Sequence, residues 1–550
     1  MMQKIRKLDF WTLITVIMVA VFGIFLIYPL FSLFSSALRE SSSGMFTLDH
    51  FVKFMSRSYY MRALLNSLKI GLAVTVLCML IGVPMAYIMT FYRIRGKKLI
   101  EILIVISMLS PPFIGAYSWI LLLGRSGAVT KLFAAIGLQS PTIYGMGGII
   151  FVMTLKLYPF MYMYMCGALK KVDGSLLEAS SSLGCRPGRQ IWRMVIPLVM
   201  PTMLAGALMV MMNAMADFGT PQLIGEGVQT MTTLIYKEYI GEVSGNGNFA
   251  AALASVMALV TAALFLAQRH YISRKSYTTN GARPVESKEL SSGKKAVAYI
   301  FIGLLVFLSC VPHLVVVYTS LYKSDSSMYR SSFTLENYKK VFSSLSKPIV
   351  NTYIYGVIAI VIIIGLSMMV AYTSMRRRNI FTRIIDTITM FPYILPGAVL
   401  GITLLVAFNH GPLTLIGTPY IIILAFVIRR MPYTLRSSSA ILYQINPSIE
   451  DASISLGCPP IRTFFKITAR LMLPGVFSGA ILSWVTVINE LSASMLLYTG
   501  KTATMSVTVY SQILRTNYGS ASALSVILTV STILSLLLFF KLTGSTEVSV

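Results

Sequence analysis

Long apolar segments recur along the whole chain, and they restrict its possible folds more than any other feature of the sequence. Most are about 20 to 25 residues long, which is the length that an α-helix needs to cross a hydrocarbon core about 30 Å thick. Only 12% of the 550 residues are charged, about half the share usual in a soluble domain. The sequence therefore predicts an all-α polytopic membrane protein and argues against a soluble enzyme. Twelve transmembrane helices are expected, near residues 12–36, 64–92, 99–123, 145–168, 194–216, 249–268, 297–321, 350–374, 382–408, 418–434, 470–490 and 521–541.

The basic residues are distributed unevenly between the two sides of the membrane. The chain has 46 Lys and Arg against 19 Asp and Glu, a formal net charge of +27. If the N-terminus is placed in the cytoplasm, the cytoplasmic segments hold 30 of the basic residues and the outer segments hold 15. Cytoplasmic loops of membrane proteins are generally enriched in Lys and Arg. The bias predicts that both termini are cytoplasmic, and it explains the charge without a nucleic-acid partner.

The chain consists of two similar halves. Residues 269–296 are polar and lack apolar periodicity, so they are expected to form a cytoplasmic linker between a first six-span half (1–268) and a second (297–550). Because equivalent loops fall on the same side of the membrane, the repeat is parallel, with a pseudo-two-fold axis along the membrane normal. The offset between equivalent residues is 285 early in each half and 273 later, as in the pairs Asn66 and Asn351, Pro159 and Pro432, Gly206 and Gly479, and Asp217 and Glu490.

The best-matched part of the repeat is a polar cytoplasmic loop that precedes the fifth span of each half. The copies read Glu178-Ala179-Ser180-Ser181-Ser182-Leu183-Gly184 and Asp451-Ala452-Ser453-Ile454-Ser455-Leu456-Gly457. Each predicts a short helix, a turn at the glycine and a second short helix. A single copy is compatible with a helix lying among lipid headgroups. Two equivalent copies favour docking onto a two-fold partner.

This loop resembles the cytoplasmic loop of binding-protein-dependent ABC importer permeases, where the pattern E-A-A-x-x-x-G precedes a proline-bearing span. The resemblance covers nearly the whole chain, as two permease halves fused in one polypeptide. It implies that each loop forms a coupling helix that fits a groove on a cytoplasmic ATPase subunit. On this resemblance the loops contribute docking carboxylates, alanines that allow close approach and glycines that make the turns, namely Glu178, Asp451, Ala179, Ala452, Gly184 and Gly457.

The sequence departs from the family pattern at two places. Ser180 and Ser453 stand where a second alanine is usual, and Asp451 replaces the glutamate of the second copy. Glu450 lies one position earlier, so the sequence leaves open whether Glu450 or Asp451 is the carboxylate that serves the second loop.

The resemblance also implies partners and a location. These are two ATP-binding cassette subunits, most simply a homodimer, an extracytoplasmic substrate-binding protein, and the bilayer of a bacterial inner (plasma) membrane. The sequence has no G-x-x-x-x-G-K-[ST] phosphate loop. The chain is therefore expected to be a transport subunit that is not itself an enzyme and holds no cofactor, with ATP hydrolysed by the separate subunits.

Two acidic residues occupy equivalent positions near the outer ends of the fifth and eleventh spans. Charges within spans are costly and commonly face a cavity or a partner. Asp217 and Glu490 are therefore candidates for the translocation pathway, where two facing acids would suit a cation or a hydrogen-bonded gate. Alternatively, each caps the following helix or bonds backbone at the end of its span. The basic residues Lys156, Arg429 and Arg430 are expected to extend towards the cytoplasmic headgroups.

Prolines interrupt the third and ninth spans. Pro111-Pro112 and Pro392…Pro396-Gly397 would either kink these helices or leave backbone carbonyls to line the pathway.

The stretch from Asp217 to Pro221 resembles the branch of the family that includes ferric iron permeases. Ferric iron is therefore the leading substrate hypothesis. The same stretch is found in relatives that carry phosphonates, thiamine, sugar phosphates or polyamines, which are the alternatives. An ion-coupled secondary transporter is the alternative class, but such a carrier does not need two matched docking loops. A membrane enzyme or a metal site would need a constellation that is not recognisable around the four histidines.

Overall fold

Helices form every regular element in the part of the chain that the structure describes. The computed structural model describes residues 10–40, 43–108, 111, 113–241, 247–273, 285, 287–323, 332–409 and 413–543. The first half comprises α1 (Phe10–Phe22), η1 (Gly23–Ile27), α2 (Tyr28–Ala37), α3 (Asp49–Ser56), α4 (Ser58–Phe91), α5 (Lys97–Met108), α6 (Ile114–Leu123), α7 (Ala128–Ala135), α8 (Met146–Leu169), α9 (Gly174–Ser182), α10 (Pro187–Gln190), η2 (Ile191–Val195), α11 (Ile196–Ala216), α12 (Gly219–Ile224), α13 (Met231–Ile240) and α14 (Gly247–Ser273).

The second half repeats most of this order, without a counterpart of α7 among its described residues, and the all-α fold is confirmed. It comprises α15 (Ser292–Ser320), α16 (Glu336–Ser344), α17 (Ser346–Arg376), α18 (Ile380–Ile388), α19 (Phe391–Ile394), α20 (Gly397–Phe408), α21 (Pro419–Gln444), α22 (Ser448–Ser455), α23 (Pro460–Thr463), η3 (Phe464–Thr468), α24 (Ala469–Ile488), α25 (Ser494–Leu497), α26 (Met505–Leu514) and α27 (Tyr518–Thr543). The three η elements are π-helical turns. Of the predicted linker, residues 274–284 and 286 lie outside the described residues.

Within the described residues, nine helical segments are long and apolar enough to cross a membrane, and each corresponds to an expected span. The third, ninth and tenth expected spans differ, so twelve continuous spans are not confirmed. The third is divided into α5 and α6 around Pro111, and Pro112 lies outside the described residues. The tenth, α21, has 26 residues but carries Arg429 and Arg430 within its apolar stretch.

The ninth span is broken by a bend of 116° between α18–α19 and α20. A proline disfavours the helical conformation of the residue before it. Leu395 precedes Pro396 and has an extended backbone, with φ −77° and ψ 127°. The predicted proline interruption is thus a sharp reversal of direction and not a gentle kink.

Equivalent hydroxyl groups hold equivalent helices in the two halves. The hydroxyl of Ser67 on α4 accepts a hydrogen bond from the backbone N–H of Met231, the first residue of α13, at 2.9 Å. In the second half, Thr352 on α17 accepts from the N–H of Met505, the first residue of α26, at 2.8 Å. The predicted match of Asn66-Ser67 with Asn351-Thr352 therefore reflects a shared structural role.

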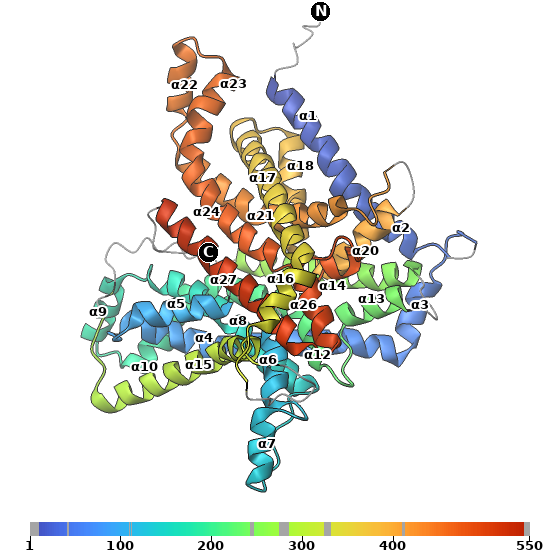
Figure 1. Ribbon diagram of the computed structural model, residues 1–550. Coiled ribbons are helices and arrows are strands. Elements are labelled where there is room, and N and C mark those ends of the chain that lie inside the picture. Colours follow the sequence, from blue (N-terminus) through green and yellow to red (C-terminus); the bar gives the residue numbers. More distant parts are fainter. Residues whose placement is uncertain are drawn as a thin grey trace, which may run out of the picture.

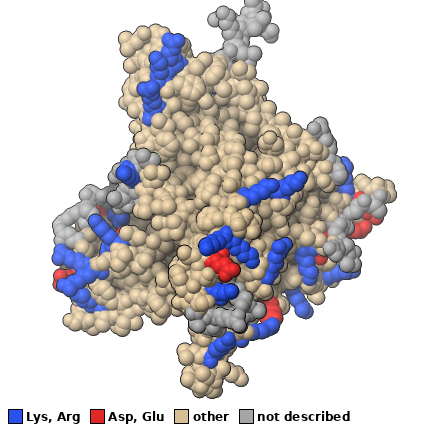
Figure 2. All heavy atoms as spheres, viewed as in Figure 1, with Lys and Arg blue, Asp and Glu red and all other residues tan. Residues whose placement is uncertain are grey.

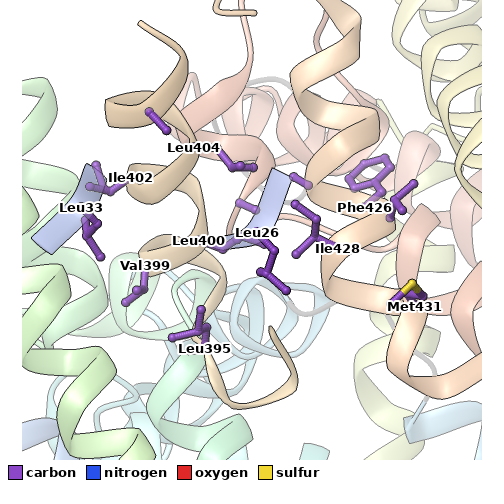
Figure 3. Close-up of a cluster of buried hydrophobic side chains, with 14 of the residues drawn as sticks. Leu26, Leu33, Leu395, Val399, Leu400, Ile402, Leu404, Phe426, Ile428 and Met431 are labelled. Atoms are coloured by element: carbon purple, nitrogen blue, oxygen red, sulfur yellow. The ribbon is translucent and has the colours of Figure 1, made fainter. Parts of the chain in front are cut away.

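The two halves exchange their first helices. The α2 helix packs against α20 of the second half, and α15 packs against α5, α6 and α8 of the first half. Figure 3 shows the side chains of Leu26 and Leu33, from η1 and α2, lying beside Val399, Leu400 and Ile402 of α20. The halves are therefore interlocked, and each depends on the other for part of its apolar core.

Small residues allow the helices of each half to pack closely, as is usual in membranes. A Cβ on Gly479 of α24 would lie 2.7 Å from the Cα of Thr434 on α21. Its equivalent, Gly206 of α11, lies against the side chain of Tyr164 on α8. Figure 1 shows two diverging groups of helices: one ends at α22 and α23, and the other at α9 and α10.

Candidate functional site

The two predicted docking loops lie at the tips of the two diverging helix groups. Figure 1 shows α9 and α10 at the end of one group and α22 and α23 at the end of the other. In Figure 2, Lys and Arg side chains gather over both tips. The loops thus stand out from the apolar body, where a soluble partner has access to both.

The first loop presents its predicted docking residues to solvent. The side chain of Asp173 caps α9 by accepting a hydrogen bond from the backbone N–H of Ser175 at 2.9 Å. Glu178 and Ala179 are exposed. Gly184 has a φ of +75°, a conformation that glycine adopts at little cost. The amide of Gln190 then donates to the carbonyl of Leu177 at 2.6 Å, which holds the second short helix against the first.

The second loop has the same shape as the first. Its two adjacent carboxylates differ in their surroundings, since one is exposed and the other is buried. Asp451 is exposed, like Glu178, and Gly457 repeats the turn with a φ of +84°. Glu450 is 7% exposed. It accepts a hydrogen bond from the Tyr372 hydroxyl at 3.0 Å and pairs with the Arg376 guanidinium at 3.3 Å. Asp451 is therefore the solvent-exposed carboxylate of this loop, while Glu450 anchors α22 to the end of α17.

Two exposed leucines were not singled out as site residues from the sequence. Leu183 and Leu456 precede the two turn glycines, and each is 89% exposed. Large apolar side chains exposed at matched positions of a repeat suit contact with a partner that has the same two-fold symmetry. The repeat itself contained this signal, since both loops read Leu-Gly-Cys.

Replacing Glu450 by glutamine is expected to destabilise the second loop, whereas Asp451→Asn is expected to leave its stability unchanged. Glutamine would remove the ion pair with Arg376 inside a mostly buried contact, and a hydrogen bond to a charged group is worth about 1.5–3 kcal/mol. Thermal unfolding of the two purified variants in detergent provides the measurement. An unchanged midpoint for Glu450→Gln, with a lowered one for Asp451→Asn, would reverse the assignment.

Each of the two predicted pathway acids forms an ion pair and a backbone hydrogen bond with residues of its own half. Asp217 is 8% exposed. Its Oδ2 contacts the ammonium of Lys156 on α8 at 2.5 Å, and its Oδ1 accepts from the backbone N–H of Thr220 at 2.9 Å. The capping alternative thus describes this acid, which also binds a cation.

Glu490 repeats this arrangement with a second cation. It is 3% exposed, contacts both Arg429 and Arg430 on α21, and accepts from the backbone N–H of Ala493 at 3.1 Å. The expectation that Lys156, Arg429 and Arg430 extend to the headgroups is wrong, because each of these cations pairs with a buried acid. Lys156 and Arg429 are 273 positions apart, the offset of the later repeat, so the sequence already contained this signal.

Glycine makes room for one of these arginines at the break of the ninth span. A Cβ on Gly397, the first residue of α20, would overlap the guanidinium of Arg429. The broken span therefore positions an ion cluster between α20, α21 and the loop after α24.

A cavity of about 420 Å³ lies between the two halves, next to this cluster. Its walls come from α8, α11 and α14 of the first half and from α19 and α21 of the second. The lining is mixed, with polar, aromatic and cationic side chains that include Asn213, Gln268, Tyr164, Tyr393, Tyr433, Arg269, Arg429 and Arg430. The volume lies within the range of small-molecule sites.

The two acid-bearing loops meet in a closed apolar layer beside the cavity. Phe218 and Leu491, which follow Asp217 and Glu490, are each 1% exposed and belong to one buried cluster. A Cβ on Gly219 would lie 3.1 Å from Leu491, so the loops of the two halves are in contact. The arrangement fits a pathway that is closed at this layer and widened on the side of the docking loops.

Two separate parts of the chain match one protein family. Residues 79–277 and 363–544 each match the model of the family described as binding-protein-dependent transport system inner membrane component. One match covers most of each half, the first ending at residue 277 within the predicted linker, so the predicted duplication is also a duplication of the family module.

Several of the relatives that align with both halves are permeases named for ferric iron. The chain is 28% identical over 512 residues to the ferric transport system permease protein FbpB of Actinobacillus pleuropneumoniae, covering 92% of this chain and 74% of that protein. It is 26% identical to the Fe(3+)-transport system permease protein FbpB 2 of Haemophilus influenzae, covering 88% and 90%. The molybdenum transport system permease protein ModB of Mycobacterium tuberculosis is 29% identical over 203 residues, covering 37% of this chain and 75% of ModB.

The family match, the multi-pass helical fold and the duplicated loops lead to the same conclusion. The chain belongs to the family of binding-protein-dependent transport system inner membrane components, as an ABC importer permease in which two family modules are fused.

Proposed function

We propose that this chain is the transmembrane subunit of an ATP-driven importer that receives ferric iron from an extracytoplasmic binding protein. The observation that supports ferric iron as the substrate is the share of this chain that aligns with relatives named for iron transport. Three relatives that align over 83–92% of this chain are named for ferric or Fe(3+) transport, and a fourth that aligns over 90% is named only as a probable ABC transporter permease. Relatives named for molybdenum or for spermidine and putrescine align over 37% of this chain, which is 72–75% of their own length, so they match one half of it.

The docking loops are proposed to transmit the ATPase cycle to the spans. Glu178 and Asp451 would each pair with a basic residue in the groove of one ATPase subunit, and Ala179 and Ala452 would allow close approach. Two loops related by the repeat fit two copies of one ATPase. Because each loop lies at the tip of a separate helix group, closure of the ATPase pair would draw the two tips together.

This movement would give alternating access between the halves. With the tips apart, the cavity lies on the side of the docking loops, which is the predicted cytoplasmic side, and the layer at Phe218 and Leu491 closes the other side. When the tips approach, the loops that carry Asp217 and Glu490 would separate and admit solute from the binding protein. Both termini are proposed to be cytoplasmic, in keeping with α1 beginning on the same side as the tip formed by α22 and α23 (Figure 1).

Uptake of radiolabelled ferric iron tests this proposal. Cells lacking the chain would be complemented with the wild type or with the Glu178→Ala, Asp451→Ala double variant. Wild type is expected to restore uptake, and the double variant, at an equal level in the membrane, is expected to lower it at least several-fold. Each lost exposed ion pair is worth up to about 1 kcal/mol, and a tenfold change corresponds to about 1.4 kcal/mol.

Other outcomes would redirect the assignment. If iron uptake did not depend on the chain, the iron proposal would fail, and phosphonates, sugar phosphates, thiamine and polyamines would be assayed next. If uptake persisted without ATP and followed an ion gradient, the chain would act as a secondary transporter. Co-purification of an ATPase with the wild type separates these two cases.

A further inference from the structure

The cavity between the halves is strongly cationic. Arg269, Arg429 and Arg430 line it, and among the described residues that line it none is Asp or Glu. The side chains of Arg429 and Arg430 are only 14% and 15% exposed. A charge held within a membrane protein at such burial is commonly functional.

The excess of positive charge arises from one position at which the two halves differ. In the first half, Lys156 and Asp217 form a pair with no net charge. The second half keeps the equivalent pair, Arg429 and Glu490, and adds Arg430, whose equivalent by the same offset of 273 is Leu157. Glu490 is therefore shared by two guanidinium groups. Its single negative charge balances only one of them, so the cluster keeps a net charge of one positive unit.

The hydrogen-bonding groups of the lining suit an anion. The Nε of Arg430 is buried without a hydrogen-bond partner among the described residues. Guanidinium groups bind carboxylate and phosphate oxygens with paired N–H donors, and the phenols of Tyr164 and Tyr433, one from each half, add O–H donors to the lining. A bare trivalent cation would instead meet a net positive charge, because Glu490 offsets only one of the three arginines, and it would be repelled.

We propose that the cavity is a transient binding site for oxyanions. Ferric iron would therefore cross this chain with carboxylate or phosphate oxygens among its ligands and not as a bare cation. This inference rests on the proposed function for the iron itself, whereas the anion site is a property of this chain alone. The ligand class is a small carboxylate or phosphate, free or bound to a metal.

Equilibrium binding of radiolabelled citrate and inorganic phosphate to the purified full-length chain tests the site. The wild type is expected to bind at least one of these two anions saturably. The triple variant Arg429→Gln, Arg430→Gln, Glu490→Gln, which removes the cluster without leaving an unpaired charge, is expected to weaken binding at least tenfold. The single variant Arg269→Gln changes an exposed side chain at the cavity and is expected to weaken it several-fold.

A matched control lies on the same helix. Arg436 is an exposed arginine of α21 outside the cavity lining, and Arg436→Gln is expected to bind both anions like the wild type. If the wild type bound neither anion, or if the triple and Arg269→Gln variants bound as the wild type does, the anion site would be overturned.

Iron uptake by the same variants separates the inference from the proposed function. Iron uptake that depends on the chain, together with no anion binding, would overturn the anion site and leave the iron proposal standing. Anion binding that is lost in the variants, together with no dependence of iron uptake on the chain, would overturn the iron proposal and leave an oxyanion importer.

Discussion

Replacing Leu183 and Leu456 together by serine is expected to detach the ATPase subunits and to abolish transport. Both leucines are 89% exposed at the tips of the two helix groups. Docking of a partner would therefore remove almost the whole of each side chain from contact with water. Full burial of a leucine contributes about 1.5–3 kcal/mol. Losing two such contacts would weaken docking by about 3 kcal/mol or more, which is about a hundredfold or more in affinity.

This effect should exceed that of Glu178→Ala with Asp451→Ala. An exposed ion pair contributes up to about 1 kcal/mol, because both partners are well solvated before they meet. The ranking of the two double variants therefore reports whether docking is mainly apolar or mainly ionic. The measurement is the amount of ATPase that co-purifies with each variant, compared at equal membrane levels.

A matched control separates docking from general effects of adding serine. Leu132 and Leu138 belong to the segment around α7 and are 64% and 57% exposed, on the predicted outer side. Leu132→Ser with Leu138→Ser is expected to leave ATPase co-purification unchanged. If the Leu183, Leu456 variant retained its ATPase as fully as this control does, the loops would not be the docking surface.

The features predicted correctly from the sequence are those fixed by local chemistry. The turns at Gly184 and Gly457 follow from the conformational freedom of glycine, and both have positive φ. The long apolar spans follow from hydropathy, because a bilayer leaves an isolated apolar segment few alternatives to a helix. These are properties of short stretches of chain that do not depend on what packs beside them.

The partners of Asp217 and Glu490 depend on how neighbouring helices are rotated about their axes. Hydropathy and the count of basic residues assign a residue to a depth and a side of the membrane, but not to a face of its helix. For this reason the sequence predicts headgroup positions for Lys156, Arg429 and Arg430, although they pair with the buried acids. The repeat offset that relates Lys156 to Arg429 was the available signal, because a cation kept at equivalent positions indicates an equivalent partner.

The sequence also does not predict that the first helix of each half packs against the other half. The apolar surface of α2 can be buried against any sufficiently apolar neighbour, and the choice of α20 depends on the shape of the broken ninth span. Prolines indicated where that span is interrupted. Its bend of 116° is determined by the tertiary packing around Leu395 and Gly397.

Replacing Glu490 by glutamine is expected to destabilise the chain more than any other single change at the pathway. Glutamine keeps the size of the side chain but leaves Arg429 and Arg430 side by side without a counter-charge. Removing one partner of a buried ion pair typically costs about 3–5 kcal/mol. The expected results are a lower midpoint of thermal unfolding in detergent and less protein in the membrane.

The equivalent change in the first half is the comparison that tests this explanation. Asp217→Asn leaves one cation, and the Lys156 side chain is 21% exposed, so its ammonium can be hydrated with a small displacement. The loss of stability should therefore be clearly smaller than for Glu490→Gln.

Removing the arginines as well should restore the stability that Glu490→Gln loses. Replacing a whole buried ion cluster by neutral side chains is often neutral or stabilising. The triple variant Arg429→Gln, Arg430→Gln, Glu490→Gln is therefore expected to unfold near the wild-type midpoint while losing citrate and phosphate binding. Equal destabilisation by Asp217→Asn and Glu490→Gln, with no recovery in the triple variant, would mean that packing at the loop after α24, and not charge, holds this site together. If the triple variant instead regained stability but did not transport, the guanidinium groups would be needed for handling the solute. Their contribution to folding would then be replaceable by neutral side chains.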